Sequence, residues 1–291
     1  MTRRRYAKKL TMRSAANSVF TVLTFVATSF AVVLLVVLLW KIAVDGLPGL
    51  SWDFLKSVPS RFPEKSGIYS PLMGSLWVIV LTGLISIPIG IAAGIYLEEM
   101  TNQKNRVAAF IQINISNLAG VPSIVYGMLG LALFVRWMDL GRSVLSGALT
   151  LSLLILPMLI TVTQEALRAV PGSLREASYA LGATQLQTIR RQVLPNAASG
   201  IFTGIILSLS RAMGETAPLI MVGAVAYVRF APKHPLDSFT VLPMQIFSWS
   251  EKPQKGFHEA AASAIIVLVV LLLVMNSVAI VLRSRNRKAY K

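Results

Sequence analysis

Six long stretches of this sequence contain almost no charged residue, and each exceeds the roughly 20 apolar residues that span a bilayer core. They cover residues 19–40, 66–97, 107–135, 143–164, 192–227 and 260–282. The fifth stretch alone carries charges inside it, Arg211 and Glu215. Because lipid cannot hydrogen-bond to a backbone, each stretch must form a helix. The sequence therefore predicts an all-α integral membrane protein with six transmembrane helices.

The composition agrees with a membrane location. Of the 291 residues, 55% are hydrophobic and 14% are charged, whereas soluble domains are about a quarter charged. In so apolar a chain, the net charge of +16 favours basic loops on one side of a membrane over nucleic-acid binding. The absence of cysteine excludes disulfides, Cys-ligated zinc and thiol nucleophiles. With only His234 and His258 as histidines, we expect no metal site.

The distribution of basic residues predicts the orientation. The N-terminal arm (residues 1–18) and the C-terminal tail (residues 284–291) are basic and contain no acid. An even number of spans puts both ends on one side, and by the positive-inside rule that side is the cytoplasm. Such arms also attract anionic lipid. Between them we expect a first transmembrane helix with an extracytoplasmic loop (residues 19–69) and a transmembrane core (residues 70–283) that contains a cytoplasmic hairpin (residues 164–196).

Small and polar residues interrupt the apolar spans. Gly90 and Gly94, and likewise Gly200 and Gly204, are spaced four apart, which lets helix backbones approach closely. This spacing is typical either of tight bundle packing or of a bundle with a polar seam that can rearrange. Amide side chains in the third stretch favour the polar seam: Gln112, Asn114 and Asn117.

Arg211 and Glu215 are the sharpest feature inside a span. A helical spacing of four puts both on one face, where they can neutralise each other. An arginine in a membrane helix costs about 2.5–3.5 kcal/mol to insert and faces the bundle or water. The pair has two interpretations. In the first, the pair joins helices. In the second, Arg211 is a cation on a permeation path, and its carboxylate partner gives way to an incoming anion. A planar guanidinium binds an oxyanion through two parallel hydrogen bonds.

The segment after the fourth stretch reads as two short amphipathic helices. Pro171-Gly172 breaks the chain, and Ser173 to Glu176 fits a capping box. Gly182 is expected to end the first helix. A second capping box is predicted from Thr184 to Gln187, and Pro195 is expected to end the second helix before the fifth span begins.

This hairpin resembles a known loop. Glu176-Ala177-Ser178, then Gly182 and later Leu194-Pro195, is similar to the E-A-A loop of the membrane subunits of ABC importers, although Gln192 stands where that loop usually has Ile. The resemblance implies that Ser173, Glu176, Ala177, Gly182, Leu194 and Pro195 belong to coupling helices that fit a cleft on an ATP-binding subunit.

A second motif resembles a narrower family. Residues 211–219, Arg-Ala-Met-Gly-Glu-Thr-Ala-Pro-Leu, are similar to the signature of phosphate-specific importer permeases of the PstA type, and residues 120–127 also resemble a segment of that subfamily. The resemblance covers roughly residues 70–282. It implies a MetI-like type I ABC importer permease in a prokaryotic cytoplasmic (inner) membrane. The implied partners are a PstC-type second permease, a PstB-type ATPase dimer and a PstS-type extracytoplasmic phosphate-binding protein.

The chain lacks the G-x4-G-K-[ST] motif that cradles ATP phosphates. We therefore expect no cofactor in this chain, with ATP and Mg²⁺ on the ATPase partner, so that the subunit is not an enzyme although the whole complex would be a phosphate-transporting ATPase. The alternative cargo is another oxyanion or a small polar nutrient. An intramembrane enzyme would need converging catalytic groups, which the spans do not offer. A secondary transporter would show inverted repeats, and none are evident in this sequence.

Overall fold

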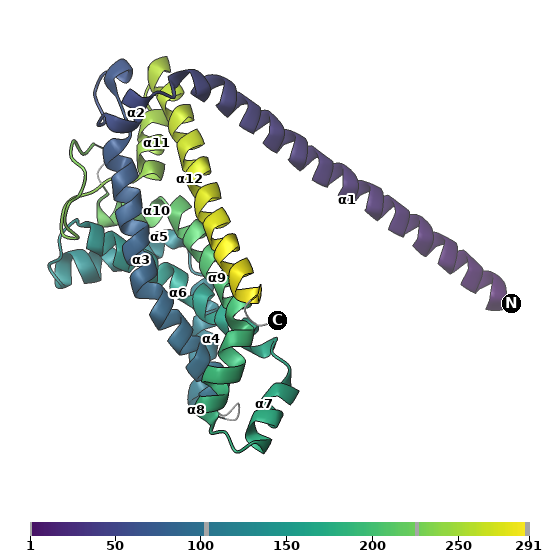
Figure 1. Ribbon diagram of the computed structural model, residues 1–291. Coiled ribbons are helices and arrows are strands. Elements are labelled where there is room, and N and C mark those ends of the chain that lie inside the picture. The colour runs from purple at the N-terminus through teal and green to yellow at the C-terminus, as the bar shows by residue number, and fades with distance from the viewer. Residues whose placement is uncertain (1, 102–104, 225–226, 289–291) are drawn as a thin grey trace.

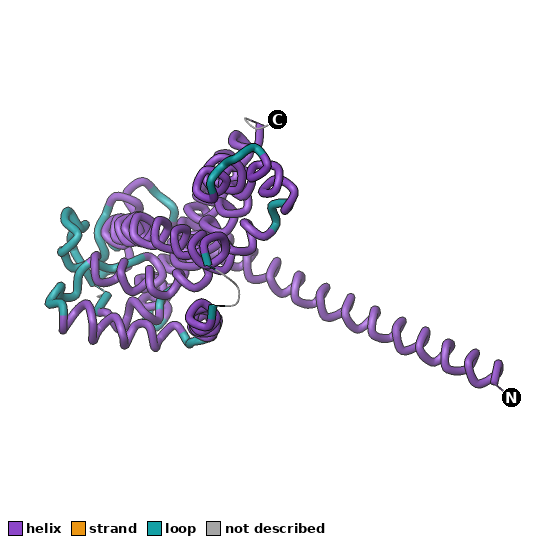
Figure 2. The backbone as a smooth tube through the Cα atoms, turned by 90° about the horizontal axis from the view of Figure 1, so that it is seen from below, coloured by secondary structure: helices purple, strands orange, loops and turns teal. Residues whose placement is uncertain are grey.

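The computed structural model describes residues 2–101, 105–224 and 227–288, and every regular element in this part of the chain is a helix (Figure 2). Five helical stretches are long and apolar enough to cross a membrane, and a bent pair makes a sixth. The predicted all-α architecture is therefore confirmed. The main helices are α1 (Thr2–Gly46), α3 (Tyr69–Ile95), α4 (Arg106–Ala119), α5 (Ser123–Gly130), α6 (Val144–Arg168), α9 (Leu194–Gly214) and α12 (Lys255–Lys288).

The third apolar stretch is not the single helix that was expected. α4 and α5, which continues through the π-helix η4 (Leu131–Trp137), meet at an angle of 105°. Gly120 caps the end of α4, and Pro122, with φ −56° and ψ 137°, stands in a non-helical conformation before α5. Proline lacks an N–H group and disfavours a helical conformation in the residue before it, so Val121 cannot continue the helix.

The fifth stretch is also interrupted. α9 ends at Gly214, and Glu215 is extended, with φ −75° and ψ 124°. The short helix α10 (Ala217–Val222) follows and ends at Gly223, whose φ of +98° is left-handed. Residues 225–226 of the expected span lie outside the described residues. A single helix over residues 192–227 was therefore a wrong expectation, because Pro218 and Gly223 favour a new start and a stop.

Glycines bring α3 and α9 close to α6. A Cβ atom on Gly90 of α3 would lie 2.8 Å from the Cβ of Leu159, and one on Gly94 would lie 2.7 Å from the Cβ of Thr163. On α9, Gly200 meets Ala166 in the same way at 2.7 Å, and Gly204 meets Val162. Any larger residue would push these backbones apart. The close approach predicted from the glycine spacing is confirmed.

Buried hydroxyls follow the contact between α3 and α6. Ser152 donates to the carbonyl of Ala148 at 2.7 Å, Thr82 donates to the same carbonyl at 3.3 Å, and Ser86 donates to that of Thr82 at 2.7 Å. In lipid such groups must find partners within the bundle. The polar seam between these helices is thus made of serine and threonine, which the prediction from amide side chains did not name.

The predicted amides have separate roles. Gln164 on α6 donates to Gln112 on α4 at 2.9 Å, which ties these two helices together. Asn114 donates to Phe110, one turn back in its own helix, at 2.7 Å. Gln112 thus makes a contact between helices, while Asn114 satisfies a carbonyl of α4.

The two ends of the bundle differ. At one end lie α2 (Trp52–Lys56), α11 (Leu242–Ser250) and the short turns η1 (Leu47–Gly49) and η2 (Pro63–Lys65), and at the other lies the hairpin (Figure 1). The first end is closed by three aromatic rings, with Trp249 between Phe54 and Phe257 at centroid distances of 6.2 and 6.3 Å. Helix α1 extends away from the bundle and joins it only at its last turns (Figure 1). There Ser263 of α12 donates to the carbonyl of Gly46 at 2.8 Å.

Candidate functional site

The Arg211–Glu215 pair forms at the break between α9 and α10. Arg211 lies in the last turn of α9, and its Nε is 3.4 Å from Oε1 of Glu215, the residue that caps the helix. The partners are therefore not on one continuous helical face, as the sequence suggested. A cation in the last turn is stabilised by the carbonyl end of the helix dipole. The Arg211 side chain keeps 54% of its surface accessible, against 18% for Glu215.

The two segments that resemble the phosphate-importer subfamily pack against each other. α5 contains residues 123–127 of the first segment, and α10 contains residues 217–219 of the second. A Cβ atom on Gly127 would lie 2.7 Å from the Cα of Pro218, so only glycine allows this contact. Tyr126, buried beside it, donates to the carbonyl of Leu118 at 2.8 Å and ties α5 back to α4. The sequence showed the two motifs, but their contact is a finding of the structure.

The first helix of the hairpin starts earlier than expected. α7 (Gly172–Ala180) has Pro171 at its N-cap, so Ser173 and Glu176 lie inside the helix and the predicted capping box at Ser173 is wrong. Pro171, with φ −56° and ψ 135°, takes the non-helical N-cap position two residues before the serine that was expected to hold it. Gly182 adopts a φ of +79° directly after the helix, as expected of a left-handed stop.

The second helix of the hairpin continues without a break into α9. Thr184 and Gln187 form the predicted capping box at the start of α8 (Gln185–Thr188). α8 continues through the π-helix η5 (Ile189–Val193) into α9, so Pro195 does not end it. The N–H of Leu194 bonds to the carbonyl of Ile189, five residues back. This wider turn makes room for the proline ring, which would clash with a carbonyl in a regular helix.

The hairpin presents an apolar surface around a hollow. Leu174, Leu181 and Leu186 are exposed. A hydrogen bond of 2.9 Å between the buried hydroxyls of Ser178 and Thr188 holds α7 against α8. The hollow has a volume of about 400 Å³, and its lining is Leu174, Ala177, Ser178, Leu181, Gly182, Ala183, Gln187, Arg191 and Gln192. Exposed leucines beside a hollow offer a surface on which a partner protein could bury apolar side chains.

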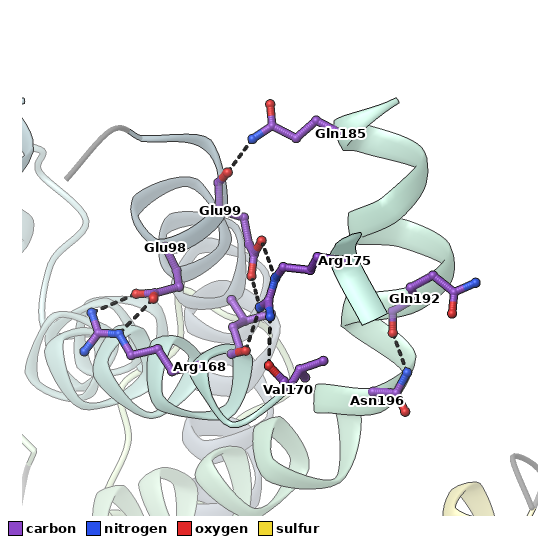
Figure 3. Close-up of polar contacts among 9 residues, drawn as sticks. Glu98, Glu99, Arg168, Val170, Arg175, Gln185, Gln192 and Asn196 are labelled. Atoms are coloured by element: carbon purple, nitrogen blue, oxygen red, sulfur yellow. Dashed lines mark hydrogen bonds and ion pairs between the residues drawn. The ribbon is translucent and has the colours of Figure 1, made fainter. Parts of the chain in front are cut away.

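Two ion pairs lie where the hairpin meets the membrane helices (Figure 3). α3 continues through the π-helix η3 (Tyr96–Met100), which carries both acids. Glu98 pairs with Arg168 at the end of α6 at 2.7 Å, and Glu99 pairs with Arg175 of α7 at 2.5 Å. The hydrogen bond with Glu99 raises the pKa of the Arg175 guanidinium. These four residues were not predicted as partners, because the two pairs join positions 70 and 76 residues apart in the sequence.

The structure brings together some of the predicted coupling residues but not all of them. Ser173, Glu176, Ala177 and Gly182 come together on α7 and the turn that follows it, whereas Leu194 and Pro195 lie at the start of α9. Among the residues that the structure describes, no three His, Asp or Glu side chains gather as metal ligands do.

Comparison with known proteins identifies residues 86–288 as a binding-protein-dependent transport system inner membrane component. The chain is 37% identical over 251 residues to the phosphate transport system permease protein PstA 1 of Mycobacterium tuberculosis (strain CDC 1551 / Oshkosh). This match covers 83% of this chain and 80% of the relative. It is also 35% identical over 220 residues to the probable ABC transporter permease protein YqgI of Bacillus subtilis (strain 168), covering 75% and 74%.

The fold has a counterpart among solved structures. An inward-facing conformation of the MetNI methionine ABC transporter matches with a TM-score of 0.60 at 18% identity, over 75% of this chain and 97% of that chain. The motifs, the helical bundle and these likenesses agree. The chain belongs to the family of binding-protein-dependent transport system inner membrane components and, within it, to the PstA-type permeases.

Proposed function

We propose that this chain is the permease subunit of an ATP-driven importer that translocates inorganic phosphate delivered by an extracytoplasmic binding protein. The name of the M. tuberculosis relative and the signature at residues 211–219 support this cargo. The partners would be a PstC-type permease, a PstB-type ATPase dimer that carries ATP and Mg²⁺, and a PstS-type binding protein. This chain would supply part of the path across the membrane and no catalytic group.

The observation that carries the proposal is the half-exposed Arg211 at the end of α9. Its guanidinium contacts Glu215 through Nε at 3.4 Å, which is long for a charge-assisted hydrogen bond, and more than half of its side chain is accessible. A loosely held guanidinium can turn toward a passing oxyanion. When the anion leaves, Glu215 neutralises Arg211 again, which prevents tight binding that would stop transport.

The test is phosphate uptake into vesicles that contain the complete complex. Arg211→Ala should lower ATP-dependent uptake at least about tenfold, the effect of losing one charge-assisted contact, without preventing assembly. Arg106→Ala is the control, because Arg106 is an exposed arginine at the start of α4. Unchanged uptake by the Arg211 variant would remove this residue from the proposed path.

The cargo is tested separately. Vesicles loaded with ATP are offered phosphate, sulfate or a small polar nutrient, each together with its binding protein. Uptake of phosphate alone supports the proposal. Uptake of another solute in its place would support the alternative importer function and leave the permease assignment intact.

We also propose that the hairpin is the ATPase contact and lies on the cytoplasmic side together with both termini. Its exposed leucines and hollow support a protein contact, and α12 runs from α11 toward the hairpin end of the bundle (Figure 1). Ser173, Glu176, Ala177 and Gly182 would meet the ATPase directly. Leu194 and Pro195 would set the direction in which the hairpin leaves α9.

A further inference from the structure

Arg175 binds three groups at once (Figure 3). Its Nη2 donates to Oε1 of Glu99 at 2.5 Å and to the carbonyl of Leu167 at 2.8 Å. Its Nη1 donates to the carbonyl of Val170 at 2.8 Å, and its Nε reaches Oε2 of Glu99 at 3.3 Å. One side chain of α7 is therefore joined to the end of α3 and to the end of α6.

The Arg175–Glu99 pair is more buried than its neighbour on the arginine side. Only 8% of the Glu99 side chain and 21% of the Arg175 side chain are accessible, whereas in the neighbouring pair Glu98 is 12% and Arg168 is 60% accessible. Water and salt screen the exposed guanidinium of Arg168, so that pair contributes less. A buried pair with extra hydrogen bonds is costly to break, because removal of one partner leaves the other charge unpaired.

The geometry of η3 separates the two acids. Consecutive residues of a helix point in different directions, and in η3 the two acids face different elements. Glu98 faces Arg168 on α6, and Glu99 faces Arg175 on α7. Gln185 of α8 also donates to the backbone carbonyl of Glu99 at 2.5 Å. Glu99 thus contacts both helices of the hairpin.

Arg175 is not needed to hold the hairpin together. The Ser178–Thr188 hydrogen bond and the Thr184–Gln187 capping box connect α7 to α8 and order α8 by themselves. α8 is continuous with α9, so a push on the hairpin reaches α9 through the chain. The side-chain connection from α7 to α3 and α6 runs through Arg175.

We propose that Arg175 is a positioning residue that transmits movement of the hairpin to α3, with Glu99 as its anchor. This inference rests on the proposed ATPase contact of the hairpin. Without Arg175, the hairpin would still bind the ATPase and move with α9 and α6, to which the chain joins it, but α7 would lose its buried ion pair with η3, and the single hydrogen bond from Gln185 to Glu99 would not make α3 follow. ATP would then be hydrolysed without transport.

The experiment measures both rates in vesicles that contain the two permeases, the ATPase and the binding protein. Arg175→Gln should keep ATP hydrolysis within about twofold and lower phosphate uptake about tenfold or more, so that the ATP spent per phosphate rises by that factor. Arg175→Lys keeps a charge for Glu99 but loses the planar fork, and an intermediate ratio is expected. Arg168→Gln, which breaks the exposed pair, should leave the ratio unchanged. A ratio unchanged in Arg175→Gln would overturn the inference.

A second measurement does not depend on transport. The chain contains no cysteine, so spin labels can be placed at Leu84→Cys on α3 and Ala180→Cys on α7 of this subunit, with any cysteines of the partner subunits replaced. In the assembled complex, Arg175→Gln should broaden the distance distribution between the labels, and Arg168→Gln should not. If Arg175→Gln does not assemble, Glu99→Gln takes its place with the same expected broadening, and an unchanged distribution overturns the inference. A wild-type complex that transports no phosphate would refute the proposed function, while the spin-label result would still decide the role of Arg175.

Discussion

Gly182 shows how a single residue can be predicted from the sequence together with its conformation. It stands directly after the helical pattern of α7, where a left-handed stop is expected, and its φ is +79°. Arg211 shows the limit of such prediction. Its pairing with Glu215 follows from their spacing, but the end of α9 between them, where Glu215 is extended, does not, because helix boundaries are the least predictable feature of a sequence.

Gly182 leads to a prediction at the residue scale. Asp and Asn both tolerate the left-handed conformation, and a Cβ atom at this position would meet no described atom within 4 Å. Gly182→Asn should therefore leave the hairpin intact. Gly182→Asp adds a carboxylate beside the hollow, which a docked partner would have to desolvate, so co-purification of the ATPase should fall about fivefold or more. Equal recovery of ATPase with both variants would count against the hairpin as the contact.

At the scale of the elements, sequence reasoning found the apolar stretches but not their shapes. Apolar length predicts a span because lipid thickness is fixed. It does not predict the 105° bend between α4 and α5, which Gly120 and Pro122 permit but packing against α10 selects. The π-helical turns η3, η4 and η5 were missed for the same reason, since a wider turn leaves no mark in hydrophobic periodicity. Two of these turns, η3 and η5, lie where the hairpin meets the bundle. The geometry that is hardest to predict from the sequence is therefore next to the proposed ATPase contact.

The glycine contacts give a prediction at this scale. Gly204 of α9 lies against the side chain of Val162 on α6, whose branched carbon cannot move aside. Gly204→Val should separate these helices and destabilise the protein by about 1–3 kcal/mol, as overpacking does. The check is thermal unfolding in detergent, with Gly172→Ala as the control because no described atom lies within 4 Å of a Cβ there. Equal melting temperatures of both variants and the wild type would show that the contact is not tight.

For the whole molecule, composition and charge predict the class correctly, because hydrophobicity and loop charge act over the entire chain rather than through single contacts. The side to which each end of the bundle points can be tested directly. Ser250→Cys at the end of α11 should react with a membrane-impermeant maleimide in intact spheroplasts, and Arg106→Cys at the start of α4, which lies outside the proposed ATPase contact, should react only in inverted vesicles. Both residues are exposed, so the difference reports sidedness. The reverse pattern would invert the proposed orientation.

The glycine contacts of α6 also bear on how the bundle is held at its spacing. Leu159 and Thr163 meet glycines of α3, and Val162 and Ala166 meet glycines of α9, so α6 carries two neighbouring tracks, each with a spacing of one helical turn. Each track sets the distance between two helix axes, and α6 belongs to both. Helix α6 is therefore the common reference for the positions of α3 and α9 in the bundle.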